Sequence, residues 1–292
     1  MKKFIKALIF VGIIYAIVMY RAYIVEYAVS FYNSHNKNIV TNKYTKNQNF
    51  ASFQRTSNYT PKNKQDLINL MYTILDNGMD NFVFACSAKY ENCADDMKDI
   101  AENGMLQVIN NYVHPYNSYN VLNYSIYMNL VNVSIEKLYS ENEIASIDSK
   151  INLISNYIIT SNMSDYDKIR AFHDYIINNT TYDDSIDDFA SHRAYNVVMN
   201  GVGVCGGYAD TMAIFLEKLQ IKNFKLSNEE HIWNVLYFNN NLYHIDMTWD
   251  DPITPDKSNM LLHDYFMITS KQLIELNDEK HIFDANLYVE LK

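Results

Sequence analysis

Glycine is scarce in this 292-residue chain, yet four of its seven glycines fall within seven consecutive positions. Gly201, Gly203, Gly206 and Gly207 surround Cys205. After the cysteine, apolar residues recur at spacings of four, three and four, which is typical of one buried helix face; they are Tyr208, Met212, Phe215 and Leu219. The sequence therefore predicts a glycine-rich turn into a buried helix that begins at or just before Cys205.

A cysteine at the start of a helix is open to two interpretations. The free backbone N–H groups and the helix dipole favour the thiolate and lower the thiol pKa below its usual value of about 8.5. Small neighbours such as Gly206 leave room for a substrate carbonyl against the same N–H groups. The alternative is a tight turn followed by an inert, buried cysteine, because glycine loops before helices are common and also bind anions.

A predicted β-hairpin favours the catalytic interpretation. Residues 231–238 and 242–247 are rich in β-branched and aromatic residues, and three asparagines, 239–241, separate them. If the first two asparagines form the turn, His231 and Asp246 become diagonal neighbours on one face of the sheet. A slip of one residue would place them on opposite faces.

These residue types fit nucleophilic catalysis by a thiol. A carboxylate at Asp246 would orient the imidazole of His231 and stabilise its protonated form, leaving the second ring nitrogen to take the proton of Cys205. Strand alternation places Trp233 on the face of His231, where it and Trp249 would wall the site, although core packing explains each tryptophan equally well.

Metal chemistry is the competing hypothesis for the same region. Its ligands would come from a set of five side chains, namely Cys205, His231, His244, His263 and Asp246. No CxxC or HExxH spacing is present in the sequence, so we expect neither a metal site nor a cofactor.

Three segments resemble the core motifs of the bacterial transglutaminase-like superfamily. They are Gly203-Val204-Cys205-Gly206-Gly207-Tyr208-Ala209, His231-Ile232-Trp233-Asn234-Val235 and the run from Tyr243 to Pro252. The resemblance implies an α+β, papain-like fold in which Cys205 is the nucleophile, His231 the base and Asp246 the orienting acid. It also implies acyl transfer or hydrolysis at amide or peptide bonds of a protein or peptide substrate, cell-wall peptide being one candidate. The alternative is a surface binding or structural module with the same cleft but no turnover.

The N-terminus has the composition of a targeting segment. Lys2, Lys3 and Lys6 precede fourteen uncharged residues, 7–20, and Arg21 follows. We expect an uncleaved single-pass membrane anchor with the N-terminus inside and the rest outside, or secretion if the segment is cleaved. The formal net charge of −10 argues against a nucleic-acid partner.

We therefore expect four segments: a membrane anchor or signal segment (1–30), a polar linker (31–62), a small α/β unit (63–140) and a transglutaminase-like catalytic domain (141–292). Within the α/β unit the pattern predicts one helix over 94–113 and one long strand over 120–134. Cys86 and Cys93 are close enough to pair, but two ordinary thiols are favoured. His173 is interpreted as a core or surface histidine, and Asp250-Asp251-Pro252 as a surface loop.

Overall fold

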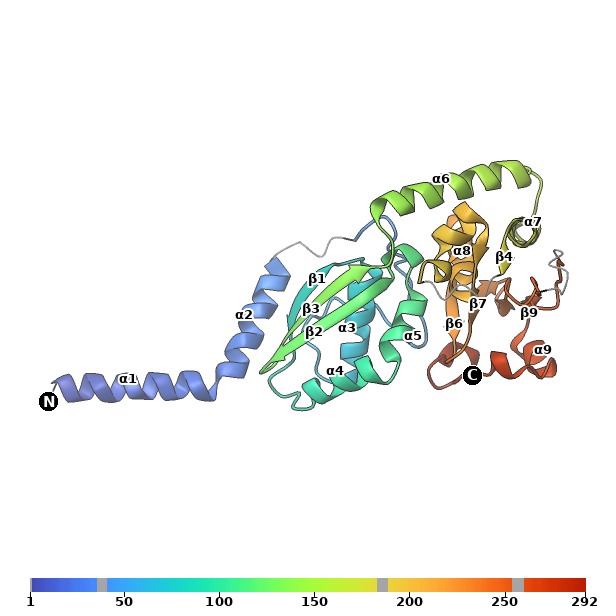
Figure 1. Ribbon diagram of the computed structural model, residues 1–292. Helices are drawn as coiled ribbons and strands as arrows, with labels where there is room; N and C mark the ends of the chain where they lie inside the picture. The colour runs from blue at the N-terminus through green and yellow to red at the C-terminus, as the bar shows by residue number, and fades with distance from the viewer. Residues whose placement is uncertain (1, 36–40, 183–188, 254–259) are drawn as a thin grey trace. The chain divides into compact units, whose positions relative to one another are not determined.

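The computed structural model describes residues 2–35, 41–182, 189–253 and 260–292 (Figure 1). The chain divides into two compact units. The N-terminal unit comprises 1–49, 53–106 and 119–136, and the C-terminal unit comprises 50–52, 107–118 and 137–292. The C-terminal unit thus begins four residues before the expected boundary at 141 and includes two short pieces from earlier in the chain.

The N-terminal unit begins with two helices, α1 (Lys2–Met19) and α2 (Arg21–His35). Within the described ranges, no single helix is long and apolar enough to cross a membrane, but α1 and α2 pass that test together as a pair bent by 67°. From Phe4 to Met19 the side chains of α1 are exposed. The second helix is tied to the rest of the unit, because Asn33 donates to the Val83 carbonyl at 3.0 Å and Glu26 accepts the N–H of Ala88 at 2.7 Å.

A three-stranded sheet with the order β1-β3-β2 forms the centre of this unit. The strands of this sheet are β1 (Asn81–Ala85), β2 (Tyr119–Tyr127) and β3 (Leu130–Lys137). Two helices, α3 (Lys64–Asp76) and α4 (Cys93–Glu102), belong to the same unit. One face of α3 is buried, with Leu67, Leu70 and Met71 inaccessible to solvent. The apolar spacing of α3 thus supplies the core of the unit.

Two elements of this region differ from the sequence-based expectation. The helix predicted over 94–113 is two helices, α4 and α5 (Met105–Tyr112), because Gly104 adopts a left-handed conformation with φ 79°. The strand predicted over 120–134 is the hairpin of β2 and β3, with Met128 at φ 55° in the turn. Apolar residues continue to alternate through the turn, so the sequence pattern did not indicate where one strand ends and the next begins.

Cys86 and Cys93 form a disulfide, so the favoured expectation of two free thiols was wrong. Cys86 follows β1 and Cys93 begins α4, and the turn between them brings their Cα atoms to 6.4 Å. This separation lies within the range that a disulfide spans. Cys205 is the remaining cysteine of the three in the chain and is free.

The C-terminal unit combines helices with a four-stranded antiparallel sheet of order β6-β7-β8-β9. Its strands are β6 (Asn223–Ser227), β7 (Ile232–Phe238), β8 (Asn241–Ile245) and β9 (Phe266–Ile268). The longer helices are α6 (Glu141–Ile158), α7 (Asp165–Asn179) and α8 (Cys205–Lys218). Shorter elements are η1 (Pro115–Asn117), β4 (Thr181–Tyr182), η2 (Phe189–His192), η3 (Asn196–Asn200), β5 (Val202–Gly203), α9 (Ser270–Glu275), η4 (Glu279–His281) and η5 (Val289–Leu291). The result is a mixed α+β fold, as expected.

The register of the β7–β8 hairpin agrees with the prediction. Phe238 pairs with Asn241, and Asn239 and Asn240 form the turn with φ of 49° and 63°. Positive φ at both central residues is the geometry of the tight hairpin turn that asparagine tolerates. His231 directly precedes β7, and Asp246 directly follows β8.

Helix α8 is buried within the C-terminal unit. Met212, Phe215 and Leu216 are inaccessible to solvent, and the rings of Phe215 and Phe172 of α7 stack with centroids 3.8 Å apart. The amide of Asn234 in β7 donates to the Ala209 carbonyl at 2.9 Å. The helix is therefore fixed to the sheet that carries His231 and Asp246.

Candidate active site

Cys205 is the first residue of α8, where the sequence predicted it, and its side chain is half-buried. Val204 is the N-cap and has extended backbone angles, and its carbonyl accepts the N–H groups of Gly207 and Tyr208 at 2.9 and 3.2 Å. Gly207 and Tyr208 therefore use this carbonyl, and the two residues before them, Cys205 and Gly206, have no preceding helical carbonyl for their N–H groups. The backbone around Cys205 therefore suits an anion at this position.

Close packing explains the glycines around Cys205. A Cβ atom at Gly206 would lie 2.9 Å from the His192 carbonyl oxygen, and one at Gly207 would lie 2.9 Å from the Ser191 carbonyl oxygen. Gly201 is needed for its backbone, with φ 67°. On the side where its Cβ would project, Gly206 thus faces the backbone of η2 and not open space.

The imidazole of His231 interacts with both other predicted catalytic groups. Its Nε2 atom is hydrogen-bonded to Oδ2 of Asp246, and both residues are buried. Burial alone would lower the pKa of His231, but the charge and hydrogen bond of Asp246, together with those of Cys205, raise it to about 10. Because Nε2 is bonded to the carboxylate, Nδ1 is the ring nitrogen left to exchange a proton with the thiol.

Asp246 accepts hydrogen bonds on both carboxylate oxygens. Oδ1 accepts the backbone N–H groups of Thr248 and Trp249 at 2.9 and 3.3 Å, and Oδ2 accepts from His281 Nε2 at 2.9 Å as well as from His231. Burial alone would raise the pKa of Asp246, but the charges and hydrogen bonds of His231 and His281 hold it well below its usual range. The carboxylate is therefore ionised and held in one orientation.

Sequence reasoning missed His281 and Asp278. His281 lies in η4 and Asp278 just before it, both more than 30 residues beyond Asp246. Nδ1 of His281 is 2.8 Å from Oδ2 of Asp278. No spacing rule connects a lone histidine in a short helical turn with a hairpin so distant in the sequence. Only the tertiary fold brings them together.

Trp233 lies beside His231, with ring centroids 5.6 Å apart and planes nearly parallel. Its indole N–H donates to Nδ1 of His244 at 3.0 Å, while Nε2 of His244 is 2.9 Å from the Ser270 hydroxyl. Burial, aided by the charge of His281, lowers the pKa of His244 to about 3. A neutral imidazole that accepts on Nδ1 donates from Nε2, so His244 holds Trp233 in place and is ill suited to act as a base.

Trp249, the second residue expected to wall the site, also contacts the histidines. Its ring lies edge-on to those of His231 and His281, with centroid distances of 6.2 and 5.1 Å. The structure therefore brings together His231, Asp246, Trp233 and Trp249. Aromatic rings on this side reduce the access of water to the imidazole–carboxylate pair.

The acidic turn after Asp246 is not the surface loop that was expected. Asp250 is inaccessible to solvent and Asp251 is 6% exposed. Each has a buried partner, because Asp250 Oδ2 is 3.1 Å from His173 Nε2 and Asp251 accepts from the Tyr208 hydroxyl at 2.5 Å. These bonds fix the turn to α7 and α8, and burial of carboxylates is tolerated where such partners exist.

Among the residues that the structure describes, two clusters have the composition of a metal site. His173, Asp174 and His263 form one, and His231, Asp246 and His281 form the other, with ligand atoms within 4.8 Å of one another in each. His173 is buried, as one of the two sequence interpretations had it, and lies between two carboxylates. Burial would lower the pKa of His173, but its hydrogen bonds to the carboxylates of Asp174 and Asp250, together with their charges, raise it. His263, which the sequence had grouped with His231 and Asp246 as a possible metal ligand, belongs to the first cluster and not to theirs.

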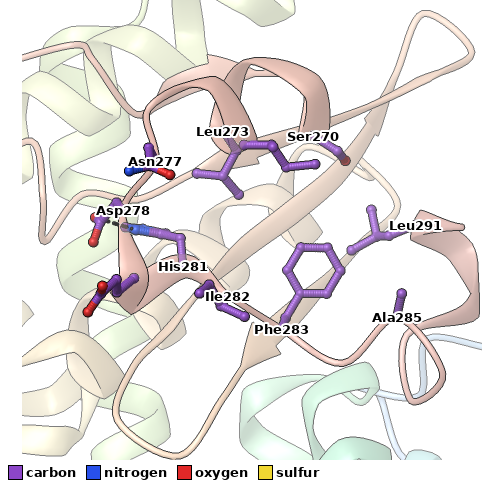
Figure 2. A pocket seen from close by; sticks show the side chains of 11 residues that line it. Ser270, Leu273, Asn277, Asp278, His281, Ile282, Phe283, Ala285 and Leu291 are labelled. Carbon is purple, nitrogen blue, oxygen red and sulfur yellow. Dashed lines mark hydrogen bonds and ion pairs between the residues drawn. The ribbon is translucent and has the colours of Figure 1, made fainter.

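A cavity of about 440 Å³ lies beside η4 and α9 (Figure 2). Apolar side chains line most of it, among them Leu273, Phe283 and Leu291, and His281 and Asp278 stand along one side. His281, which contacts Asp246, and its partner Asp278 are therefore also part of the wall of this cavity.

Residues 153–247 match the family model described as the transglutaminase-like superfamily. Among solved structures, a TGase crystal structure is similar at 17% identity with a TM-score of 0.36, and the alignment covers 48% of this chain and 46% of that one. A candidate cysteine protease from Cytophaga hutchinsonii is similar at 14% identity with a TM-score of 0.30, with coverage of 48% and 65%. No match was found among curated proteins. The segment that matches the transglutaminase-like family model, residues 153–247, contains Cys205, His231 and Asp246.

Proposed function

We propose that the C-terminal unit is a cysteine-dependent acyl-transfer enzyme or hydrolase that acts on amide or peptide bonds. Cys205 is the nucleophile, His231 the general base and Asp246 the orienting acid. The observation that supports this assignment is the position of His231, which interacts with the thiol of Cys205 and is hydrogen-bonded to a buried, ionised carboxylate. This arrangement stabilises a thiolate–imidazolium pair, the reactive form of a catalytic cysteine.

The proposed reaction proceeds in two stages. The Cys205 sulfur attacks the carbonyl carbon of the substrate, and His231 passes a proton to the leaving amine, so that a thioester forms and the C–N bond breaks. Water or a second amine, deprotonated by His231, then attacks the thioester and releases Cys205. The backbone N–H groups of Cys205 and Gly206, at the start of α8, are the donors proposed to stabilise the oxyanion. A protein or peptide is the proposed substrate, with cell-wall peptide as one candidate.

Alkylation by iodoacetamide tests the nucleophile directly. Cys86 and Cys93 are joined in the disulfide, so without a reductant Cys205 is the thiol that reacts. We expect rapid alkylation of the native protein at pH 6, none of Cys205→Ala, and slow alkylation of His231→Ala. Equal rates for the native protein and His231→Ala at this pH would show that the thiol is not activated by the imidazole.

Mass spectrometry identifies the reaction type. Cell-surface peptides incubated with the protein are scanned for cleavage, deamidation and incorporation of an added amine. We expect one of these products with the native protein and none with Cys205→Ala. Modified peptides that form equally with Cys205→Ala would exclude Cys205 as their cause.

We also propose that the C-terminal unit faces an oxidising compartment outside the membrane. The Cys86–Cys93 disulfide lies in the N-terminal unit, after the apolar segment, and supports an oxidising location for the chain that follows that segment, since disulfides persist in oxidising environments. The lysines that precede the apolar N-terminal segment favour an N-terminus on the inside. Labelling of intact cells with a membrane-impermeant amine reagent checks the orientation, and failure to label the C-terminal unit until the cells are opened would contradict it.

A further inference from the structure

Asp246 has two imidazole partners where the proposed mechanism requires one. Its Oδ2 atom is hydrogen-bonded to His231 Nε2 and lies 2.9 Å from His281 Nε2. His281 in turn lies 2.8 Å from Asp278 through Nδ1. The four side chains form a continuous buried or half-buried chain in the order Asp278, His281, Asp246, His231, which ends at Cys205.

The direction of these hydrogen bonds follows from the charge of the carboxylates. Burial would raise the pKa of Asp278, but hydrogen bonds from the Lys280 backbone, His281 and Tyr265 lower it, and Asp246 is also ionised. An ionised carboxylate only accepts hydrogen bonds. His281 therefore donates from both ring nitrogens, one to each carboxylate, and its ring orientation is determined at both ends.

Aromatic rings enclose the His281 side chain on several sides. Tyr265 stacks on it at 4.7 Å, while Trp233 and Trp249 lie edge-on at 4.8 and 5.1 Å. The titratable groups that face it are Asp246, Asp278, His231, His244 and Tyr265. The Tyr265 hydroxyl donates to Asp278 at 3.1 Å, so the outer carboxylate is itself held in place.

We infer that His281, oriented by Asp278, is a positioning residue that holds the Asp246 carboxylate in the orientation needed to align His231. The inference rests on the function proposed above. Two backbone N–H groups hold Oδ1 of Asp246, and His281 supplies the fixed donor on the opposite oxygen besides His231 itself. Without His281 a buried oxygen of Asp246 loses a charge-assisted bond, and the carboxylate is free to turn away from His231.

Three variants test this role by the pH dependence of Cys205 alkylation. His281→Leu removes both hydrogen bonds, while His281→Gln keeps an amide N–H near the position of Nε2. Ile282→Ala is the matched control, because this neighbouring side chain is 68% exposed. For His281→Leu we expect the alkylation rate at pH 6 to fall about tenfold or more, the loss typical of a hydrogen bond to a charged group. In a plot of alkylation rate against pH, the rise in rate at acid pH should also occur at a higher pH for His281→Leu than for the native protein.

His281→Gln should recover most of the rate, and Ile282→Ala should match the native protein. Circular dichroism and the melting temperature establish that each variant is folded. If His281→Leu does not fold, Asp278→Asn provides the second variant, with a smaller shift of this rise in rate in the same direction. Alkylation profiles for the folded variants that overlay the native profile would overturn the inference, as would equal losses in the Leu and Gln variants.

The native protein separates this inference from the proposed function. If native Cys205 is not activated at pH 6, the proposed function itself fails. If native Cys205 is activated and the folded His281 and Asp278 variants react like it, the triad stands and only the positioning role is overturned.

Discussion

Replacement of Asp246 by asparagine is the sharpest perturbation of the proposed site, because it preserves shape and removes charge. In the native protein both oxygens of Asp246 accept, Oδ2 from two imidazoles and Oδ1 from two backbone N–H groups. An asparagine has one accepting oxygen and one donating NH₂ group. Whichever way the amide is turned, donors face donors on one side.

The size of the effect follows from the bond that is lost. A hydrogen bond between charged groups contributes about 1.5 to 3 kcal/mol. At about 1.4 kcal/mol per tenfold change in rate, Asp246→Asn should slow Cys205 alkylation at pH 6 and peptide turnover by about 10- to 160-fold. We expect kcat to fall far more than KM rises, because in the proposed mechanism Asp246 acts on His231 and not on the substrate.

The assay compares Asp246→Asn with Asp264→Asn, in which an exposed carboxylate of the same unit is neutralised. Alkylation rates are measured from acid to alkaline pH, and the melting temperature of each variant is recorded. An Asp246→Asn profile that coincides with that of the control would refute the orienting role. So would a change confined to KM.

Three further predictions concern stability. The raised pKa of His231 means that its contribution to folding is complete below about pH 6.5 and is lost as the pH rises through about 10. In urea unfolding, the stability difference between the native protein and His231→Gln should therefore shrink as the pH rises. A difference that grows with pH would contradict the assignment. Replacing both Cys86 and Cys93 by serine should lower the unfolding free energy of the N-terminal unit by about 2 to 3 kcal/mol, because the disulfide closes a short loop; unchanged alkylation of Cys205 is the accompanying control. Asn240→Val should destabilise the hairpin by about 1 to 2 kcal/mol, because residue 240 has a φ of 63°, which a β-branched side chain disfavours. Asn240→Gly should not destabilise it. Equal melting temperatures for the two variants would show that the conformation of residue 240 does not limit the stability of the hairpin.

Local patterns predicted the elements that carry the proposed triad. The apolar spacing after Cys205 located α8, and the asparagine turn determined the register of β7 and β8. Strand alternation then placed Trp233 beside His231. These features depend on residues close together in the sequence, where helix and strand periodicity apply directly.

Features that depend on distant contacts were not predictable in the same way. His281 reaches Asp246 only because the chain returns after β9, and its sequence surroundings contain no motif. The burial of Asp250 depends on His173 of α7, which lies 77 residues earlier. The glycines illustrate both cases, since their clustering signalled a backbone requirement but did not show that η2 packs against them.

The disulfide has a consequence for the chemistry of the remaining cysteine. Because Cys86 and Cys93 are bonded to each other, Cys205 has no free partner thiol within its own chain. A thiolate that is oxidised to a sulfenic acid is ordinarily rescued by condensation with a second thiol. None of the 292 residues supplies a resolving thiol for Cys205, so in the proposed oxidising compartment the lifetime of the proposed nucleophile would depend on an external thiol.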